Sequence, residues 1–345
     1  MTQATRSNLM SVATTLAANI DATQDYIPVA STTNFSTSIV AEIETTNEVV
    51  SFTDISSNIF PYSQDFTNAA WTKNNITLAA NDTTAPDGTT TATKMTEDTS
   101  SGNHRAYHGE GSQAAAAHTN SVFLKKDSRS WGLLGFNNRP DSSAWYDLEN
   151  GVVGSTQSNV SNAIEDVGNG WYRCIITLTG AFSTAVYLQF GPTTGDNVGT
   201  YLGAAESIFA WGAQVELGTS ASTYLPTTSA GLVGLTDVTR GVNGTTAASA
   251  SSGDAIQQLP YALLNVDMPV RLTGLSVSSD GTGAGRLTLC DKVGTHLCDV
   301  DIPDTKIFDL TFDGGILFPN GIYVANSDNI TAYTLYTDKY SGDSL

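Results

Sequence analysis

The tryptophans are distributed very unevenly along this chain of 345 residues. All five lie between residues 58 and 231, at Trp71, Trp131, Trp145, Trp171 and Trp211. Large aromatic side chains contribute much of the buried area of a core, so a segment that gathers them predicts a domain with its own core. The stretches before and after this segment must then build a separate structure.

Two short stretches on either side of the aromatic segment read as partner strands. "SFTDISS" at 51–57 ends an alternating strand pattern, and "LTDVTRG" at 235–241 resumes one. One domain can be inserted into an exposed turn of another when the ends of the inserted domain lie close together. We therefore predict three parts: a discontinuous small β anchoring module of residues 1–57 plus 232–260, an inserted jelly roll of residues 58–231, and a C-terminal β-sandwich of residues 261–345.

The residue pattern predicts an all-β fold. Charged residues make up only 14% of the chain, and Thr-, Ser- and Gly-rich alternating stretches favour strands over helices. Within the insert, segments such as "GWYRCIITLTG" and "AVYLQFG" are separated by Gly, Asn and Asp turns, which is typical of a sandwich or jelly roll. Residues 1–20 show the only helical character, and it is weak.

The charge argues against two classes of partner. The formal net charge is −19, with 34 acidic against 15 basic residues, so we expect no nucleic acid bound through its phosphates and no electrostatic docking on an anionic membrane. No apolar run has transmembrane length, and the first 20 residues lack a signal-peptide pattern, so we expect no membrane insertion. Cys290 and Cys298 flank a predicted hairpin and are either bridged or, as expected in the cytoplasm, both reduced.

The sequence gives little indication of a catalytic site or a metal site. Glycoside hydrolysis needs two carboxylates that face each other across a cleft, and no acid pair meets that requirement: Asp147 and Glu149 share a strand face, but Glu149 lies in the turn "LENG". His104 and His108 would be separated by roughly 13 Å on a strand, too far for one metal ion. We expect a non-enzymatic protein with no cofactor and no metal.

Alternation along the insert strands turns a mixed set of side chains away from the expected core. In "AWYDL", "WYRCIITL", "AVYLQF" and "IFAWGAQVEL", the apolar positions, including Phe209 and Trp211, are predicted to face inward. Aromatic rings beside planar polar groups are the mixture that recognises sugars, and the outward set is such a mixture. If these strands are neighbours in one sheet, the candidate glycan site consists of Trp145, Asp147, Arg173, Tyr187, Gln189 and Gln214. The alternative is that a loop or another subunit covers Trp145 and Tyr187.

Several blocks of the sequence resemble known proteins. "NIFPYSQDFTNAAWTK", "TAPDGTTTATKMTED", "IEDVGNGWYRCIITLTG" and "FAWGAQVELGTSASTYLPTTSA" occur in order and resemble carbohydrate-binding-module-like jelly rolls of bacteriophage structural proteins. "NEVVSFTDIS" with "LTDVTRGVNGTTAASASSGDAI" resembles a small β module of phage tail and fibre proteins. "DIPDTKIFDLTFDGGILFPNGIYV" is similar to a small sandwich of phage virion proteins.

The resemblance implies a virion component that is assembled in the host cytoplasm. Its partners would be other virion proteins and itself, as a homo-oligomer with a trimer favoured. The leading hypothesis is a non-enzymatic structural protein of the tail or fibre, whose jelly roll contacts a host-surface glycan or a neighbouring virion protein. One alternative is a capsid decoration or head-fibre protein, and another, from a different class, is a polysaccharide depolymerase.

Overall fold

The computed structural model describes most of the chain. The described residues are 2–7, 13–33, 35, 39–43, 45–46, 48–112, 116–182, 185–242, 245–258, 270–279, 285–290, 296–303, 307–318, 322–328 and 330–339. Every regular element among them is a β-strand, which confirms the predicted all-β fold. The weak helical pattern of residues 1–20 does not correspond to a helix in the described residues. β1 (Thr2–Ser7) and β2 (Ala13–Thr15) instead pair with other strands.

The chain divides into two compact units. The insert unit is Asp54–Thr236, and the anchor unit combines Met1–Thr53 with Asp237–Leu345. The predicted three-part division has slightly different boundaries and remains a prediction. Among the described residues, no helix has the length and apolar character needed to cross a membrane.

The insert unit is built from two six-stranded sheets. Sheet 1 has the order β15-β14-β13-β18-β11-β7, and its strands are β7 (Thr72–Asn74), β11 (Arg105–Ser112), β13 (Trp131–Phe136), β14 (Ser143–Asp147), β15 (Val152–Thr156) and β18 (Ala185–Thr193). Sheet 2 has the order β16-β17-β12-β20-β9-β8, and its strands are β8 (Ile76–Thr83), β9 (Ala92–Glu97), β12 (Ala116–Lys126), β16 (Val160–Asp166), β17 (Trp171–Phe182) and β20 (Ser207–Leu217). The short β10 (Ser101–Gly102) and β19 (Tyr201–Leu202) pair separately.

The hydrophobic core of the insert unit lies between these two sheets. Tyr146 and Phe190 from sheet 1 share one buried cluster with Val122, Cys174 and Ile176 from sheet 2. Each such side chain stabilises the fold by about 1.5–3 kcal/mol relative to an exposed one. The two-residue alternation of the strands therefore identified most of the inward-facing residues correctly.

A β-bulge in β20 reverses this alternation. The ladder between β12 and β20 shifts register between Ser121 and Phe123, and Gly212 has a φ of 62°. A bulge adds one residue to a strand, so the side chains beyond it change faces. Trp211, which was predicted to face inward, lies on the other side of sheet 2 in a cluster with Phe123 and Trp171, and Phe209 packs against the same cluster.

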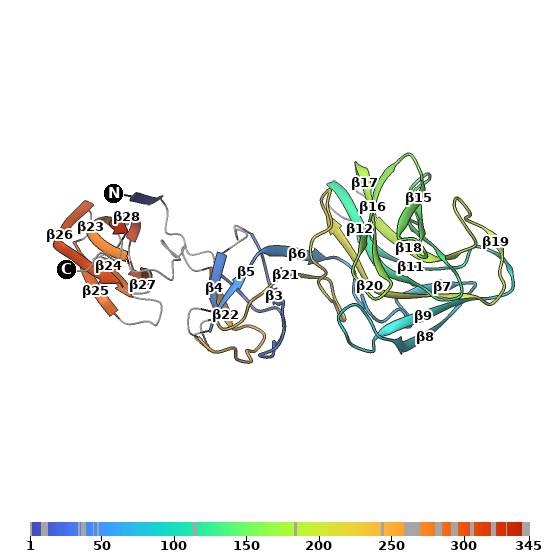
Figure 1. Ribbon diagram of the computed structural model, residues 1–345, viewed down its shortest axis with the longest axis horizontal. Helices are drawn as coiled ribbons and strands as arrows, with labels where there is room; N and C mark the ends of the chain where they lie inside the picture. The colour runs from blue at the N-terminus through green and yellow to red at the C-terminus, as the bar shows by residue number, and fades with distance from the viewer. Residues whose placement is uncertain are drawn as a thin grey trace. The chain divides into compact units, whose positions relative to one another are not determined.

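The strands that enter and leave the insert unit pair with each other. β6 (Asp54–Asn58) and β21 (Leu232–Thr236) are antiparallel, with Asp54 opposite Thr236 and Asn58 opposite Leu232. Figure 1 shows β6 in blue and β21 in orange side by side, although most of the insert separates them in sequence. These pairs confirm that "SFTDIS" and "LTDVTRG" are partners.

Strands from both sides of the insertion also build the anchor unit. One sheet has the order β2-β22-β4-β5, formed with β4 (Ile39–Ile43), β5 (Glu48–Phe52) and β22 (Ala255–Gln258). β3 (Ile27–Val29) precedes β4 along the chain, and Val29 at its end forms an antiparallel bridge with Leu16. β22 comes after the insert, yet it pairs with β4, which comes before it.

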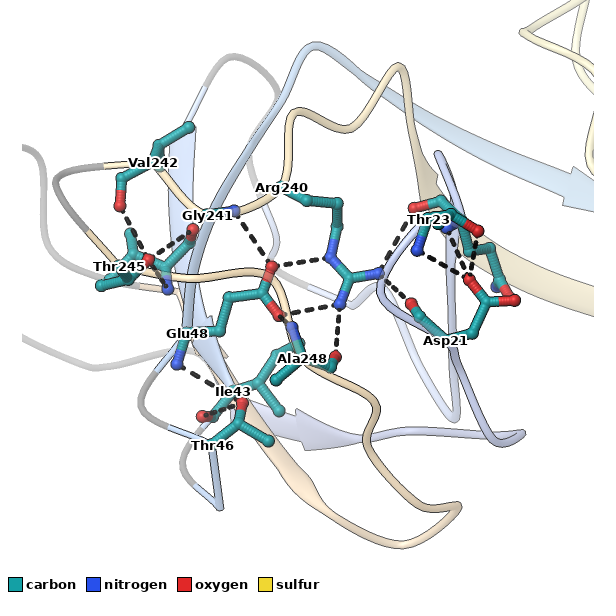
Figure 2. A network of polar contacts seen from close by, with 12 residues as sticks. Asp21, Thr23, Ile43, Thr46, Glu48, Arg240, Gly241, Val242, Thr245 and Ala248 are labelled. Atoms are coloured by element: carbon teal, nitrogen blue, oxygen red, sulfur yellow. Dashed lines mark hydrogen bonds and ion pairs between the residues drawn. The ribbon is translucent and has the colours of Figure 1, made fainter.

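A buried ion pair joins the same two parts of the chain. The carboxylate of Glu48 accepts hydrogen bonds from Nε and Nη2 of Arg240, each at 2.7 Å, and their side chains are 0% and 7% exposed. Arg240 also donates to the carbonyl oxygens of Asp21 and Ala248, while the backbone N–H groups of Gly241 and Ala248 donate to Glu48 (Figure 2). We call this network the Arg240 clasp.

The end of the chain forms two further sheets. The first has the order β1-β28-β23-β26 and the second β25-β24-β27. Their strands are β23 (Val270–Ser279), β24 (Gly285–Cys290), β25 (His296–Ile302), β26 (Ile307–Phe318), β27 (Tyr323–Asp328) and β28 (Ile330–Lys339). Leu272, Leu287 and Phe318 belong to their shared buried cluster.

The first strand of the chain belongs to this C-terminal part. β1 pairs with β28, with Thr2 opposite Thr337, so residues 2–7 extend a sheet of the C-terminal part and not the anchoring module in which the sequence placed them. β24 and β25 pair as the predicted hairpin. Cys298 has a free thiol, and the side chain of Cys290 lies outside what the structure describes.

Candidate functional site

The structure separates the six predicted site residues into two groups. Trp145 and Asp147 lie in β14 of sheet 1, and Tyr187 and Gln189 lie in β18 of the same sheet. The other two residues, Arg173 in β17 and Gln214 in β20, belong to sheet 2. The prediction of one shared face is therefore wrong. Alternation indicates which side chains avoid the core, but it does not indicate which strands are neighbours.

Trp145 and Asp147 are engaged in the fold. Trp145 is 3% exposed and donates its indole N–H to the carbonyl oxygen of Val198 at 2.9 Å, so a loop covers it, as the alternative interpretation held. Asp147 accepts hydrogen bonds from the backbone N–H groups of Glu149 and Asn150 and from the Asn150 amide. Burial acts to raise the pKa of Asp147, but these hydrogen bonds hold it below its ordinary value.

Gln214 fastens a peptide segment over the outer face of sheet 2. Its Oε1 accepts a hydrogen bond from the N–H of Leu225 at 2.7 Å, and its Nε2 donates to Glu216 at 3.0 Å. Glu216 in turn accepts a hydrogen bond from the N–H of Ser222 at 3.0 Å. Burial raises the pKa of Glu216 despite these hydrogen bonds. Gln214 therefore holds the segment at residues 222–225 in place.

Arg173 lies on the same outer face of sheet 2. Its Nε and Nη2 approach Oγ of Ser121 at 3.3 and 3.0 Å, and its guanidinium lies 5.6 Å from the centre of the Phe123 ring. Burial lowers its pKa, while the carboxylates of Glu165 and Glu216 act in the opposite direction. The 7% exposure of Arg173 leaves little of it for a ligand.

The outer face of sheet 1 keeps two aromatic rings partly accessible. Tyr107 lies opposite Gln189 in the β11–β18 ladder, and Gly109 lies opposite Tyr187. Tyr107 and Tyr187 are both half-buried. On β11, Ala106 lies between Arg105 and Tyr107 and points the other way, into the core. We call the outward side chains Arg105, Tyr107, Ser143, Tyr187 and Gln189 the tyrosine face.

Two glycines shape the tyrosine face. A Cβ at Gly109 would lie 2.2 Å from Cε1 of Tyr187, so the edge of that ring occupies the space a side chain would need. A Cβ at Gly135 would lie 2.5 Å from Oγ of Ser143 and 2.8 Å from Nε2 of Gln189. The two polar groups therefore converge over the Gly135 backbone, next to the two rings.

Arg105 is the charged group of the tyrosine face. Its Nη1 donates to Oε1 of Gln189 at 2.5 Å, and its Nη2 donates to the carbonyl oxygen of Gly199 at 3.0 Å. Burial lowers the pKa of this guanidinium, and the Tyr201 phenol acts in the opposite direction. An arginine side chain stays protonated in proteins, so the face carries a positive charge.

Arg105 and Tyr107 were not among the predicted site residues. Within "HRAYH", only the two histidines were candidates, as a possible metal pair. His108 packs inward, with its ring centre 4.8 Å from that of Phe60, and its Nδ1 lies 2.7 Å from the carbonyl oxygen of Ala70. The same alternation turns Arg105 and Tyr107 outward, so the signal was present. Among the described residues, no three His, Cys, Asp or Glu side chains group as metal ligands.

Comparison with known proteins gives a weak structural likeness. The sequence matches no protein-family model, and it matches no curated protein. Among solved structures, it is similar to the N-terminal CBM22-1–CBM22-2 tandem domain of Paenibacillus barcinonensis Xyn10C, with 12% identity over 83% of this chain and 90% of that chain. The TM-score is 0.29.

Proposed function

We propose that the insert unit is a glycan-contacting module and that the chain is a non-enzymatic structural protein of a phage virion. The observation that carries the glycan-binding part is the tyrosine face. Tyr107 and Tyr187 present partly accessible rings, which can stack on the C–H faces of a sugar. The partly exposed Ser143 places a hydroxyl beside the rings, where a sugar has its hydroxyls, and the buried Gln189 lies beneath them at 5% exposure.

The carboxylates support a binding role over a catalytic one. Asp147 in sheet 1 closes its own turn, and Glu216 in sheet 2 holds the 222–225 segment. The two carboxylates therefore belong to different sheets and do not form the facing pair of a glycosidase. No observation favours the polysaccharide depolymerase.

The virion role is supported by the resemblance of the sequence blocks to phage structural proteins. In this proposal the anchor unit attaches the chain to other virion proteins, as part of a homo-oligomer for which a trimer is favoured. Tail or fibre placement is the preferred location, and capsid decoration or a head fibre is the alternative. Negative-stain labelling of particles with an antibody against the insert unit distinguishes these placements.

Glycan binding is tested with variants of the two rings. We expect Tyr107→Ala and Tyr187→Ala each to weaken retention on a glycan array or on host cells about tenfold, since an aromatic contact contributes about 0.5–1.5 kcal/mol beyond its buried area. Their melting temperatures should change little, because both rings are half-buried. Val152→Ala is the matched control, as Val152 is 50% exposed at the opposite edge of sheet 1. Unchanged retention in both tyrosine variants would refute the proposal.

Trp145→Ala separates the covered ring from the accessible ones. Trp145 is 3% exposed, so we expect this variant to lower the free energy of unfolding by about 3–5 kcal/mol. Any loss of glycan retention should then follow the loss of folded protein. If Trp145→Ala keeps the melting temperature and loses retention, Trp145 belongs to the binding surface after all.

A further inference from the structure

We propose that the tyrosine face takes an acidic glycan and that Arg105 receives its carboxylate or sulfate group. This inference rests on the proposed glycan-binding function and names the class of sugar. The hydrogen-bond partners of Arg105 are neutral oxygens, those of the Gln189 amide and the Gly199 carbonyl. In the described part of the chain, no carboxylate forms an ion pair with it.

Other arginines of this protein do have carboxylate partners. Arg129 pairs with Glu97 and Glu206, each at 2.6 Å, and Arg240 pairs with Glu48. Even Arg286, which is 54% exposed, lies 2.7 Å from Asp301. Arg173, like Arg105, has only a neutral hydrogen-bond acceptor, but the carboxylates of Glu165 and Glu216 act on its charge, whereas no carboxylate of the described residues acts in this way on Arg105. A buried charge is normally paired, so a ligand anion is the partner that would complete it.

Arg105 also fixes the orientation of the amide beside it. A guanidinium only donates hydrogen bonds, so the atom of Gln189 that faces it must be Oε1. Nε2 of Gln189 then points to the opposite side, toward the position above Gly135 and Oγ of Ser143. The face thus offers the partly exposed guanidinium of Arg105 and hydroxyl of Ser143, joined by the buried amide of Gln189, which matches a sugar that carries an anionic group and neighbouring hydroxyls.

The geometry of the cation suits such a group. The planar fork of a guanidinium fits the paired oxygens of a carboxylate or sulfate, and the two hydrogen bonds of Arg105 to Gln189 and Gly199 leave further N–H donors. The net charge of −19 opposes general attraction of polyanions. Retention of an acidic polymer by this protein would therefore have to come from a local site.

The experiment compares polymers that differ only in charge. The full chain is titrated with polygalacturonate, with its carboxyl-reduced form, and with dextran sulfate beside dextran. We expect at least one acidic polymer to bind about tenfold or more tightly than its neutral counterpart, because a hydrogen bond to a charged group is stronger than one between neutral groups. The pair that shows the difference identifies carboxylate or sulfate as the group. Arg105→Gln should abolish the difference, while Arg286→Gln, which removes the same charge elsewhere, should not.

A second variant guards against misfolding of Arg105→Gln. Gln189→Glu places a carboxylate on Arg105, so it should keep or raise the melting temperature and still abolish the preference for the acidic polymer. Equal binding of each acidic and neutral pair would overturn the inference but leave the proposed function standing. A preference that survives in both variants would also overturn it. If the unmodified chain binds no polymer and no array glycan, the proposed function falls and this inference falls with it.

Discussion

Two guanidinium groups of this protein, Arg240 in the anchor unit and Arg105 in the insert unit, lie in contrasting environments. Arg240 makes a two-pronged ion pair with Glu48 and donates further hydrogen bonds to backbone carbonyls. Arg105 meets an amide oxygen and a carbonyl oxygen. Both are held by good hydrogen bonds, but only the charge of Arg240 is neutralised within the described residues.

The difference separates a structural arginine from a candidate binding arginine. Glu48 comes before the insertion and Arg240 after it, so their ion pair holds two distant parts of the chain in one unit. Removing one partner of a buried ion pair leaves an uncompensated charge, which costs far more than the pair itself contributes. The environment of Arg105 has no such partner to lose, so its charge remains for an external anion.

The largest expected effect comes from breaking the Arg240 clasp. We expect Glu48→Gln to lower the free energy of unfolding of the anchor unit by about 3–5 kcal/mol, because Arg240 is left buried without its counter-charge. Calorimetry and amide hydrogen exchange in β5 and β22 measure this. Arg286→Ala is the control, since its partner Asp301 is 71% exposed and such pairs contribute only about 0–1 kcal/mol. Equal effects of the two substitutions would refute the distinction.

Lowering the pH should destabilise the Arg240 clasp, but by less than the substitution Glu48→Gln does. Burial acts to raise the pKa of Glu48, but the hydrogen bonds from Arg240, Ala248 and Gly241 bring it below its ordinary value. A lowered carboxylate pKa contributes stability above the unfolded-state pKa of about 4.3, and that stability is lost as the pH falls through the folded-state value. The melting temperature of the anchor unit should therefore decrease between about pH 5 and pH 3. Glu48→Gln should show a smaller decrease, and an equal decrease would contradict this role of Glu48.

The smallest expected effect concerns the tyrosine face. In Gly109→Ala the new Cβ would lie 2.2 Å from Tyr187, so the half-buried ring must move, at a cost of about 1 kcal/mol. We expect glycan retention to decrease severalfold with little change in melting temperature. Gly111→Ala on the same strand is the control, because a Cβ there meets no atom within 4 Å. Unchanged retention in Gly109→Ala would mean that the position of the Tyr187 ring does not matter for binding.

The sequence predicted the fold class and the strand partners well. Period-two alternation identified Tyr146, Phe190 and Ile176 as core residues, and local pattern alone paired the stretches around Asp54 and Thr236. It failed at Trp211, because a bulge adds one residue and the sequence gives no strong signal of where a ladder shifts register. It also failed to place residues 2–7, whose partner strand lies at the far end of the chain.

The candidate site was harder to predict, because it depends on which strands become neighbours. Alternation turned Trp145, Arg173 and Gln214 away from the core correctly, but strand order placed them in two sheets. It could not show that the segments around Val198 and Leu225 cross the outer faces and cover these residues. Of the predicted set, Tyr187 stays partly accessible, whereas Gln189 beside it is 5% exposed and bonded to Arg105.

The paired entry and exit strands have a consequence for resistance to proteolysis. Two peptide connections, at residues 53–54 and 236–237, link the insert unit to the rest of the chain. A protease that cleaves one of them leaves the other intact, and the ladder between β6 and β21 keeps the cut end in place. Shedding of the insert therefore requires two cleavages, whereas a domain at a chain terminus is released by one.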